Sequence, residues 1–220
     1  MESKYNFKEL MKDRHSAREF LPKEIPEETL KEIVKTALLS PSWGNSQPWN
    51  VYVITGKALQ DLRTEWISKN EQGIKGYSDI KIVHRTEFQE RCQKNMAEIA
   101  EQMKVAINDP EMKSFWRKNV ECFNAPAIMY LTLIKGHSEW STYDLGGFGL
   151  ALMLAAKDYG VDSIVAYELC KYPDVVRKYA KIPENEDVCI GIGFGYENDD
   201  IVNKFRAKKD DIEELCHFIK

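Results

Sequence analysis

Residues 143–159 form the segment that most restricts how this chain can fold. The segment is predicted to be a helix, and its apolar side chains cover most of the helix circumference. These side chains are Leu145, Phe148, Leu150, Leu152, Met153 and Leu154. A helix that is apolar on nearly every side needs cover on nearly every side, so two arrangements remain open. The helix is either the central core helix of one chain, or a second copy of the chain provides part of its cover.

Two further apolar runs have the character of buried strands. Residues 125–134 are almost continuously apolar after Pro126, which is typical of a strand covered on both faces, and residues 188–194 repeat this pattern. The other predicted elements are strands over 50–55 and 163–167 and helices over 3–12, 27–38, 59–67 and 173–179. No repeat, low-complexity segment or linker separates them. The sequence therefore predicts a single α+β domain over residues 1–220.

Two polar segments differ from this core. Residues 70–120 are rich in Lys, Glu and Gln, yet apolar residues recur at helical spacing within them. This stripe consists of Phe88, Cys92, Met96, Ile99 and Met103. We therefore expect a helical excursion at about 70–120 rather than a disordered segment. Residues 198–220 form a charged C-terminal arm in which Ile212, Leu215 and Phe218 provide a possible docking stripe.

Charge and cysteine usage exclude several classes of protein. The formal net charge is −4, which gives no electrostatic basis for binding nucleic acid or an anionic membrane. The first residues are charged and lack the apolar region of a signal peptide, and no apolar stretch is long enough to span a bilayer. The 5 cysteines are scattered and form no C-x-x-C motif, as expected of reduced thiols. We expect a cytoplasmic protein with neither a nucleic-acid nor a membrane partner.

A basic cluster lies near the N-terminus, at residues 14–18. Arg14, Ser16 and Arg18 alternate along the chain, so in an extended segment they point to one side. Two guanidinium groups and a hydroxyl suit a phosphate, which accepts several charge-assisted hydrogen bonds. A solvated loop before a helix is the alternative. A second basic cluster, Arg206, Lys208 and Lys209, lies near the other end, and a phosphate bound from both ends would explain both clusters.

Residues 40–49 form a loop rich in amides, hydroxyls and turn-forming residues. Asn45 and Gln47 can each donate and accept hydrogen bonds, which fits the edge of an isoalloxazine ring or a nucleobase. Trp43 is able to stack on a planar ring. The alternative is a structural loop in which Pro and Gly form turns and Trp49 fills the core.

Other motifs for chemistry are absent from the sequence. Gly191, Gly193 and Gly195 resemble a dinucleotide fingerprint, but no amphipathic helix follows and the acidic residues 197–200 would repel a phosphate. We interpret these glycines as sites of close strand packing. The histidines have no metal-ligand spacing, and neither a nucleophile elbow nor a P-loop occurs. We therefore expect no metal and no catalytic side chain, and an organic cofactor that carries the chemistry.

Three groups of residues resemble the FMN-dependent nitroreductase family. The first is Arg14-x-Ser16-x-Arg18-x-Phe20, followed by Pro22, a helix and Ser40-Pro41-Ser42-x-x-Asn45-x-Gln47-Pro48-Trp49. The second is Asn124-Ala125-Pro126 with Asp144-x-Gly146, Ala155-Ala156 and Gly160. The third is Tyr172-Pro173-Asp174-Val175-Val176, the glycine-rich strand, Tyr196 and Asn203-x-x-Arg206-x-x-Lys209. The resemblance covers most of the chain apart from about residues 70–115.

The resemblance implies a nitroreductase-like α+β fold, with a central mixed β-sheet flanked by helices, and an intertwined homodimer with two FMN sites at the subunit interface. Residues 70–120 would form a lid that covers the site and selects the acceptor. NADH or NADPH would reduce the flavin and leave before a small acceptor, such as a nitroaromatic or a quinone, takes its place. This is a ping-pong oxidoreductase mechanism, in which protein groups orient the reactants.

The resemblance also implies which residues contact FMN. Those of one subunit are Arg14, His15, Ser16, Arg18, Val165, Ala166, Tyr167, Glu168, Arg206 and Lys209, and those of the partner are Pro41, Ser42, Trp43, Asn45 and Gln47. Val165–Glu168 would lie near the flavin N5 edge. Two departures from the family pattern affect this assignment. Lys209 stands where arginine is usual, which loses the guanidinium fork, and the stretch from Gly160 to Ser163 lacks the commoner second glycine.

Two other functions fit the same residues. One is reductive dehalogenation of an aromatic substrate such as a halotyrosine within the same fold, which the acids and lysines of residues 85–118 do not exclude. The other is a flavin-binding homodimer without turnover.

Overall fold

The computed structural model describes residues 6–220, so residues 3–5 of the helix predicted over 3–12 lie outside the described part of the chain. The described helices are α1 (Phe7–Asp13), α2 (Glu27–Ala37), α3 (Gly56–Glu71), α4 (Glu90–Ile107), α5 (Lys113–Val120), α6 (Glu139–Asp158), α7 (Pro173–Ala180) and α8 (Ile212–Leu215). The strands are β1 (Trp49–Thr55), β2 (Ala127–Ile134), β3 (Asp162–Ala166) and β4 (Glu186–Gly195). Short 3₁₀ turns are η1 (Trp43–Asn45), η2 (Arg85–Glu87), η3 (Cys122–Asn124), η4 (Tyr167–Leu169) and η5 (Ile201–Lys204).

The strands form one sheet in the order β1-β2-β4-β3, and every strand pair is antiparallel. This corrects the expectation of a mixed sheet. β2 and β3 run in the same direction, as a crossover through α6 requires, but β4 lies between them, so no two parallel strands are hydrogen-bonded. Among residues 6–220, the parallel pairing is an isolated bridge between Ser16 and Ser163.

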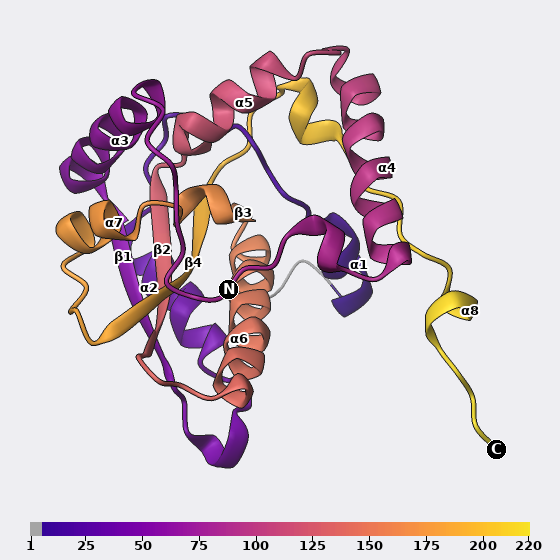
Figure 1. Cartoon of the computed structure of the whole chain (residues 1–220). Coiled ribbons are helices and arrows are strands. Elements are labelled where there is room, and N and C mark those ends of the chain that lie inside the picture. Colours follow the sequence, from indigo (N-terminus) through magenta and orange to yellow (C-terminus); the bar gives the residue numbers. More distant parts are fainter. Residues whose placement is uncertain (1–5) are drawn as a thin grey trace.

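Helices cover both faces of this sheet (Figure 1). On one face, Ile128 and Tyr130 of β2 belong to a core cluster shared with α3 and α7. On the other face, Met129, Leu131 and Leu133 belong to a cluster shared with α2 and α6. The alternation follows from the period of two in a strand. Every residue of β2 except Ile134 is buried, so the prediction of a strand covered on both faces is confirmed.

The glycines of β4 are explained by close packing. A Cβ atom on Gly191 would lie 2.7 Å from Cβ of Leu169, and one on Gly195 would lie 2.7 Å from the ring of Phe20. Both distances are shorter than side chains tolerate, so these positions have no room for a larger residue. The interpretation of the glycine run as strand packing is therefore confirmed.

Helix α6 is buried on the side that faces the sheet and exposed on the other side. Phe148 and Leu152 are fully buried, and the Phe148 ring stacks on Trp49 with a centroid distance of 4.4 Å. Trp140, Tyr143 and Leu150, in contrast, are 66%, 77% and 39% exposed. One chain therefore provides cover for only part of this apolar helix.

Residues 72–120 are helical in part, as the sequence predicts. α4 and α5 form an arch beside the sheet (Figure 1), and Phe88 lies just before α4 rather than within it. Met103 and Ile107 of α4 are buried against Val202 and Phe205 of the tail. The C-terminal segment then extends away from the rest of the chain, with Ile212, Leu215 and Phe218 all more than half exposed, so the predicted stripe is not docked within one chain. None of the helices within residues 6–220 is long and apolar enough to cross a membrane.

Candidate functional site

The basic segment 14–18 runs beside the edge strand β3. Ser16 bridges Ser163, and the Ala17 N–H donates to the Ser163 carbonyl at 3.0 Å. Burial alternates along the segment: His15 and Ala17 are buried, whereas Arg14, Ser16 and Arg18 are partly exposed. The alternation agrees with the prediction that Arg14, Ser16 and Arg18 point to one side.

His15 points inward, and both of its ring nitrogens have partners in the protein. Nε2 lies 2.7 Å from Oε2 of Glu197, and Nδ1 lies 2.8 Å from the Asp13 carbonyl oxygen. These contacts connect the start of the segment to the end of the sheet. The structure therefore gives His15 a role in anchoring the segment, separate from the outward-facing groups.

Asn203 joins the basic segment to the C-terminal tail. Its Oδ1 accepts a 2.7 Å hydrogen bond from the Arg18 N–H, and its Nδ2 donates to the Glu19 carbonyl at 2.8 Å. Asn203 is 4% exposed, so these bonds are made away from water. In the sequence, Asn203 stands out only as part of the family pattern, and its role in joining the two segments was missed. Its position three residues before Arg206 was the sequence signal that could have indicated this role.

Arg18 and Arg206, here called the arginine pair, come together although they are 188 positions apart in the sequence. Burial lowers the pKa of Arg18, and the nearby charge of Arg206 lowers it further, to about 10. The guanidinium of Arg18 donates to the Ser16 carbonyl at 2.9 Å, and that of Arg206 donates to the Asn203 carbonyl at 2.6 Å. Within residues 6–220, neither guanidinium lies within ion-pair distance of a carboxylate. Two guanidinium groups near each other without an acidic partner are suited in charge to an anion.

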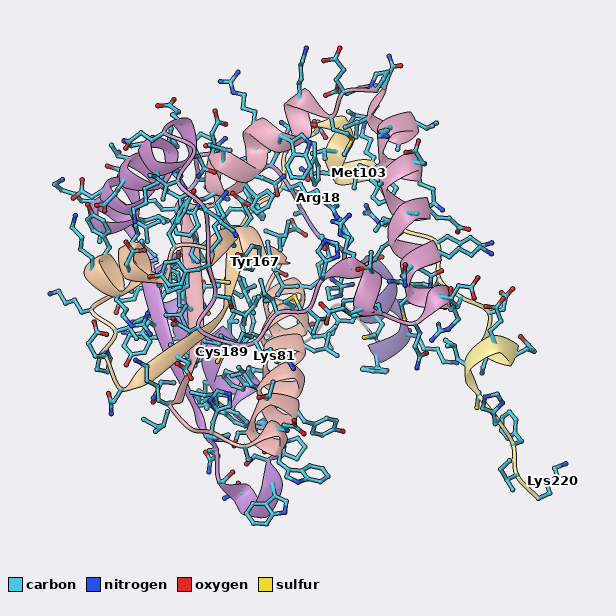
Figure 2. The ribbon with its side chains drawn as sticks, viewed as in Figure 1. Arg18, Lys81, Met103, Tyr167, Cys189 and Lys220 are labelled. Atoms are coloured by element: carbon cyan, nitrogen blue, oxygen red, sulfur yellow. The ribbon has the colours of Figure 1, made fainter. Side chains whose placement is uncertain are left out.

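The end of β3 and the turn after it lie beside the basic segment. Val165 and Tyr167 are 42% and 43% exposed, and β3 is at the edge of the sheet. Figure 2 shows Arg18 and Tyr167 in the same part of the molecule, between the sheet and the arch of α4 and α5. Glu168 instead pairs with Lys171 at 2.5 Å. Burial raises the pKa of Tyr167, as do the nearby charges of Cys170 and Glu168.

The loop of residues 41–47 is not part of this group in one chain. It joins α2 to β1 at the bottom of the view in Figure 1, whereas Arg18 lies in the upper part of the same view in Figure 2. Asp144 of α6 fixes the loop by accepting from the Trp43 N–H at 2.9 Å, and Ser42 Oγ accepts from the Gln47 N–H at 2.9 Å. Asn45 and Gln47 both have positive φ, which holds the loop in a tight turn. Together with the exposed side of α6, the loop lines a groove of about 760 Å³.

Lys209 follows Arg206 by three residues and lines a groove beside α4. The groove has a volume of about 490 Å³ and lies between the tail and α4, with Arg91 and Lys94 on the opposite wall. The structure thus places near one another Arg14, Ser16, Arg18, Val165, Ala166, Tyr167 and Arg206. It places elsewhere in the chain Pro41, Ser42, Trp43, Asn45 and Gln47. In the described part of the chain, no three His, Cys, Asp or Glu side chains gather as metal ligands would.

Comparison with known proteins shows which family the chain is similar to. The model of the nitroreductase family matches residues 11–196. Nitroreductase NfnB from Mycolicibacterium smegmatis is 27% identical over 217 residues, which cover 95% of this chain and 91% of NfnB. The 4-nitrobenzoate reductase from Pseudomonas putida is 23% identical over 222 residues, which cover 97% of this chain and 96% of the reductase. The crystal structure of the FMN-dependent nitroreductase NfnB from Mycobacterium smegmatis in complex with NADPH matches with a TM-score of 0.89 at 26% identity, over 97% of each chain. The chain described here belongs to the nitroreductase family.

Proposed function

We propose that this protein is an FMN-dependent oxidoreductase that transfers electrons from NADH or NADPH to a small acceptor, with nitroaromatic compounds as the main substrate class. The observation that carries the proposal is the arginine pair, which has no acidic partner among residues 6–220. The family supports the reaction, since NfnB is FMN-dependent and binds NADPH.

The residues fit FMN in their chemistry. A phosphate monoester carries close to two negative charges at neutral pH and accepts several hydrogen bonds, which suits two guanidinium groups and the nearby Ser16. Val165 and Ala166 belong to an edge strand, whose free backbone groups are suited to the polar edge of a flavin ring. Arg14, Ser16, Arg18 and Arg206 would hold the ribityl phosphate, and Val165–Tyr167 would lie against the ring.

FMN held there would supply the two-electron redox chemistry that links the nicotinamide donor to the acceptor. The protein contributes orientation. The Asn203 hydrogen bonds hold the segment of Arg18 in a fixed position relative to the tail. Beside the end of β3, the Tyr167 hydroxyl donates to the Tyr77 carbonyl at 3.4 Å. Residues 72–120, which include α4 and α5, act as the lid that limits the size of the acceptor.

We further propose that the active form is a homodimer and that residues 41–47 contact the flavin of the partner subunit. The support is twofold: the loop lies far from the arginine pair of its own chain, and the exposed side of α6 beside it carries Trp140, Tyr143 and Leu150. Gly146 and Gly147 on that side are exposed, which permits close approach of a second helix. The 5 cysteines form no disulfide among residues 6–220, which fits our expectation of a cytoplasmic location.

Anaerobic spectroscopy tests the reaction. We expect NADH or NADPH to bleach the flavin absorbance of the purified protein, and a nitroaromatic to restore it. Restoration by a halotyrosine in preference to nitroaromatics and quinones would instead indicate the dehalogenase alternative. A flavin that neither nucleotide bleaches would indicate a binding protein without turnover.

A further inference from the structure

Lys118 of α5 binds carboxylates from two distant parts of the chain. Its Nζ lies 2.8 Å from Oε2 of Glu19 and 2.8 Å from Oδ2 of Asp200. The Lys118 side chain is 15% exposed, and those of Glu19 and Asp200 are 12% and 29% exposed. Burial alone would lower the pKa of Lys118, but the hydrogen bonds to Asp200 and Glu19 raise it overall, so the ammonium group stays charged.

The two carboxylates lie next to the residues that hold the arginine pair. Glu19 directly follows Arg18, and its carbonyl accepts from Asn203. Asp200 caps η5, the turn that contains Asn203, by accepting from the Val202 N–H at 2.9 Å. Lys118 therefore connects the segment that carries Arg18 to the segment that carries Arg206.

The positive charge of Lys118 also compensates the negative charges of Glu19 and Asp200. Glu19 has a second partner in Asn124, whose Nδ2 donates to Oε1 at 2.9 Å, but a neutral amide leaves the carboxylate charge uncompensated. Without Lys118, the charges of two partly buried carboxylates would be left uncompensated, one on the segment of Arg18 and one at the start of the turn that contains Asn203. Like charges in a partly buried site interact more strongly than in water.

We propose that Lys118 is a positioning residue for the phosphate of FMN. It holds the basic segment and the tail at their spacing by compensating the charges of Glu19 and Asp200, so that Arg18 and Arg206 stay together at the cofactor site. The proposal rests on the proposed function, because it assumes that FMN binds at the arginine pair. It also assigns α5 a direct connection to the cofactor site.

The experiment compares FMN with riboflavin, which has the same ring and ribityl chain but no phosphate. Dissociation constants of both are measured for the flavin-free wild type, Lys118→Met, Lys118→Arg and Arg117→Met. Arg117 is a matched control, because it is the preceding residue on the same helix and its side chain is 78% exposed. Among residues 6–220 its ion pair is with the nearby Glu121, at 2.8 Å. Lys118→Gln replaces Lys118→Met if the latter does not fold.

We expect Lys118→Met to weaken FMN binding about tenfold, the size typical of a residue that acts without touching the ligand, and to change riboflavin binding less than about twofold. Lys118→Arg should retain most of the FMN affinity, and Arg117→Met should retain all of it. Equal losses for FMN and riboflavin, or no loss in Lys118→Met, would overturn the proposal while leaving the proposed function intact. A wild type that binds no FMN would overturn both.

Discussion

The backbone N–H of Arg18 donates a 2.7 Å hydrogen bond to Oδ1 of Asn203, which lies 185 positions later in the chain. This bond and the one from Asn203 Nδ2 to the Glu19 carbonyl fix the position of the first basic segment relative to the second. We therefore expect Asn203→Ala to lower the free energy of unfolding by about 1–3 kcal/mol, because it leaves the partly buried Arg18 N–H unpaired and removes one of the two hydrogen bonds to the Glu19 carbonyl. Urea denaturation measures this change. Asn185→Ala, at an exposed position, is the control and should be close to neutral; similar effects in both variants would contradict the assigned role.

The arginine pair provides the second prediction. Arg18→Ala and Arg206→Ala should each weaken FMN binding by about 1.5–3 kcal/mol for each charged hydrogen bond that is lost. Titration of the flavin-free variants with FMN, followed by fluorescence, measures the effect. Arg117→Ala removes an exposed guanidinium and should leave the affinity unchanged. Unchanged affinity in both variants would mean that Arg18 and Arg206 are only surface residues.

The lowered pKa of Arg18 predicts how phosphate recognition depends on pH. In the flavin-free protein Arg18 is charged below about pH 10, because burial and then Arg206 lower its pKa to that value. Only the charged form binds a phosphate strongly. The ratio of FMN affinity to riboflavin affinity should therefore be constant between about pH 7.5 and 9 and fall as the pH rises through about 10. The ratio is measured because it cancels ionisation of the flavin ring, and a constant ratio up to about pH 11 would disprove the assignment.

The exposed side of α6 predicts where association can be disrupted. Phe148 and Leu152 are fully buried within one chain, so a charge there would damage the monomer core rather than an interface. Leu150 is 39% exposed and lies beside Gly146 and Gly147. Leu150→Glu should therefore weaken both dimer association and flavin binding. Sedimentation velocity at nanomolar concentration is the measurement, with Val105→Glu, 81% exposed on α4, as the control. Obligate interfaces commonly bury about 2,000–5,000 Å², so the wild type should remain dimeric. A folded wild-type monomer that keeps its flavin at this dilution would refute the shared site.

Local patterns predicted most of the fold. The continuous apolar run of β2 and the alternation of Arg14, Ser16 and Arg18 depend on near neighbours in the chain, and the structure agrees with both. Local patterns could not predict the order of the strands in the sheet. Whether β4 or β3 lies beside β2 depends on contacts between distant segments, and the expected mixed sheet was consequently wrong.

For the site, too, local sequence patterns did not reveal contacts between distant segments. Composition indicated which residues suit a phosphate, but not that His15 turns inward to Glu197 or that Lys209 lies in the groove along α4. The contribution of Lys118 was hidden for a related reason. A lysine in a polar helix has the sequence pattern of a solvated residue, and its partners Glu19 and Asp200 are far away in the chain.

The identity of the bound flavin is the most direct test of the central claim, that the arginine pair and the edge of β3 form an FMN site. The protein is purified without added flavin, denatured, and the supernatant is separated by chromatography against FMN, FAD and riboflavin standards. We predict FMN, in an amount close to one molecule per chain, and its loss from a variant that combines Arg18→Ala with Arg206→Ala. Recovery of FAD, of riboflavin or of no flavin would contradict the account.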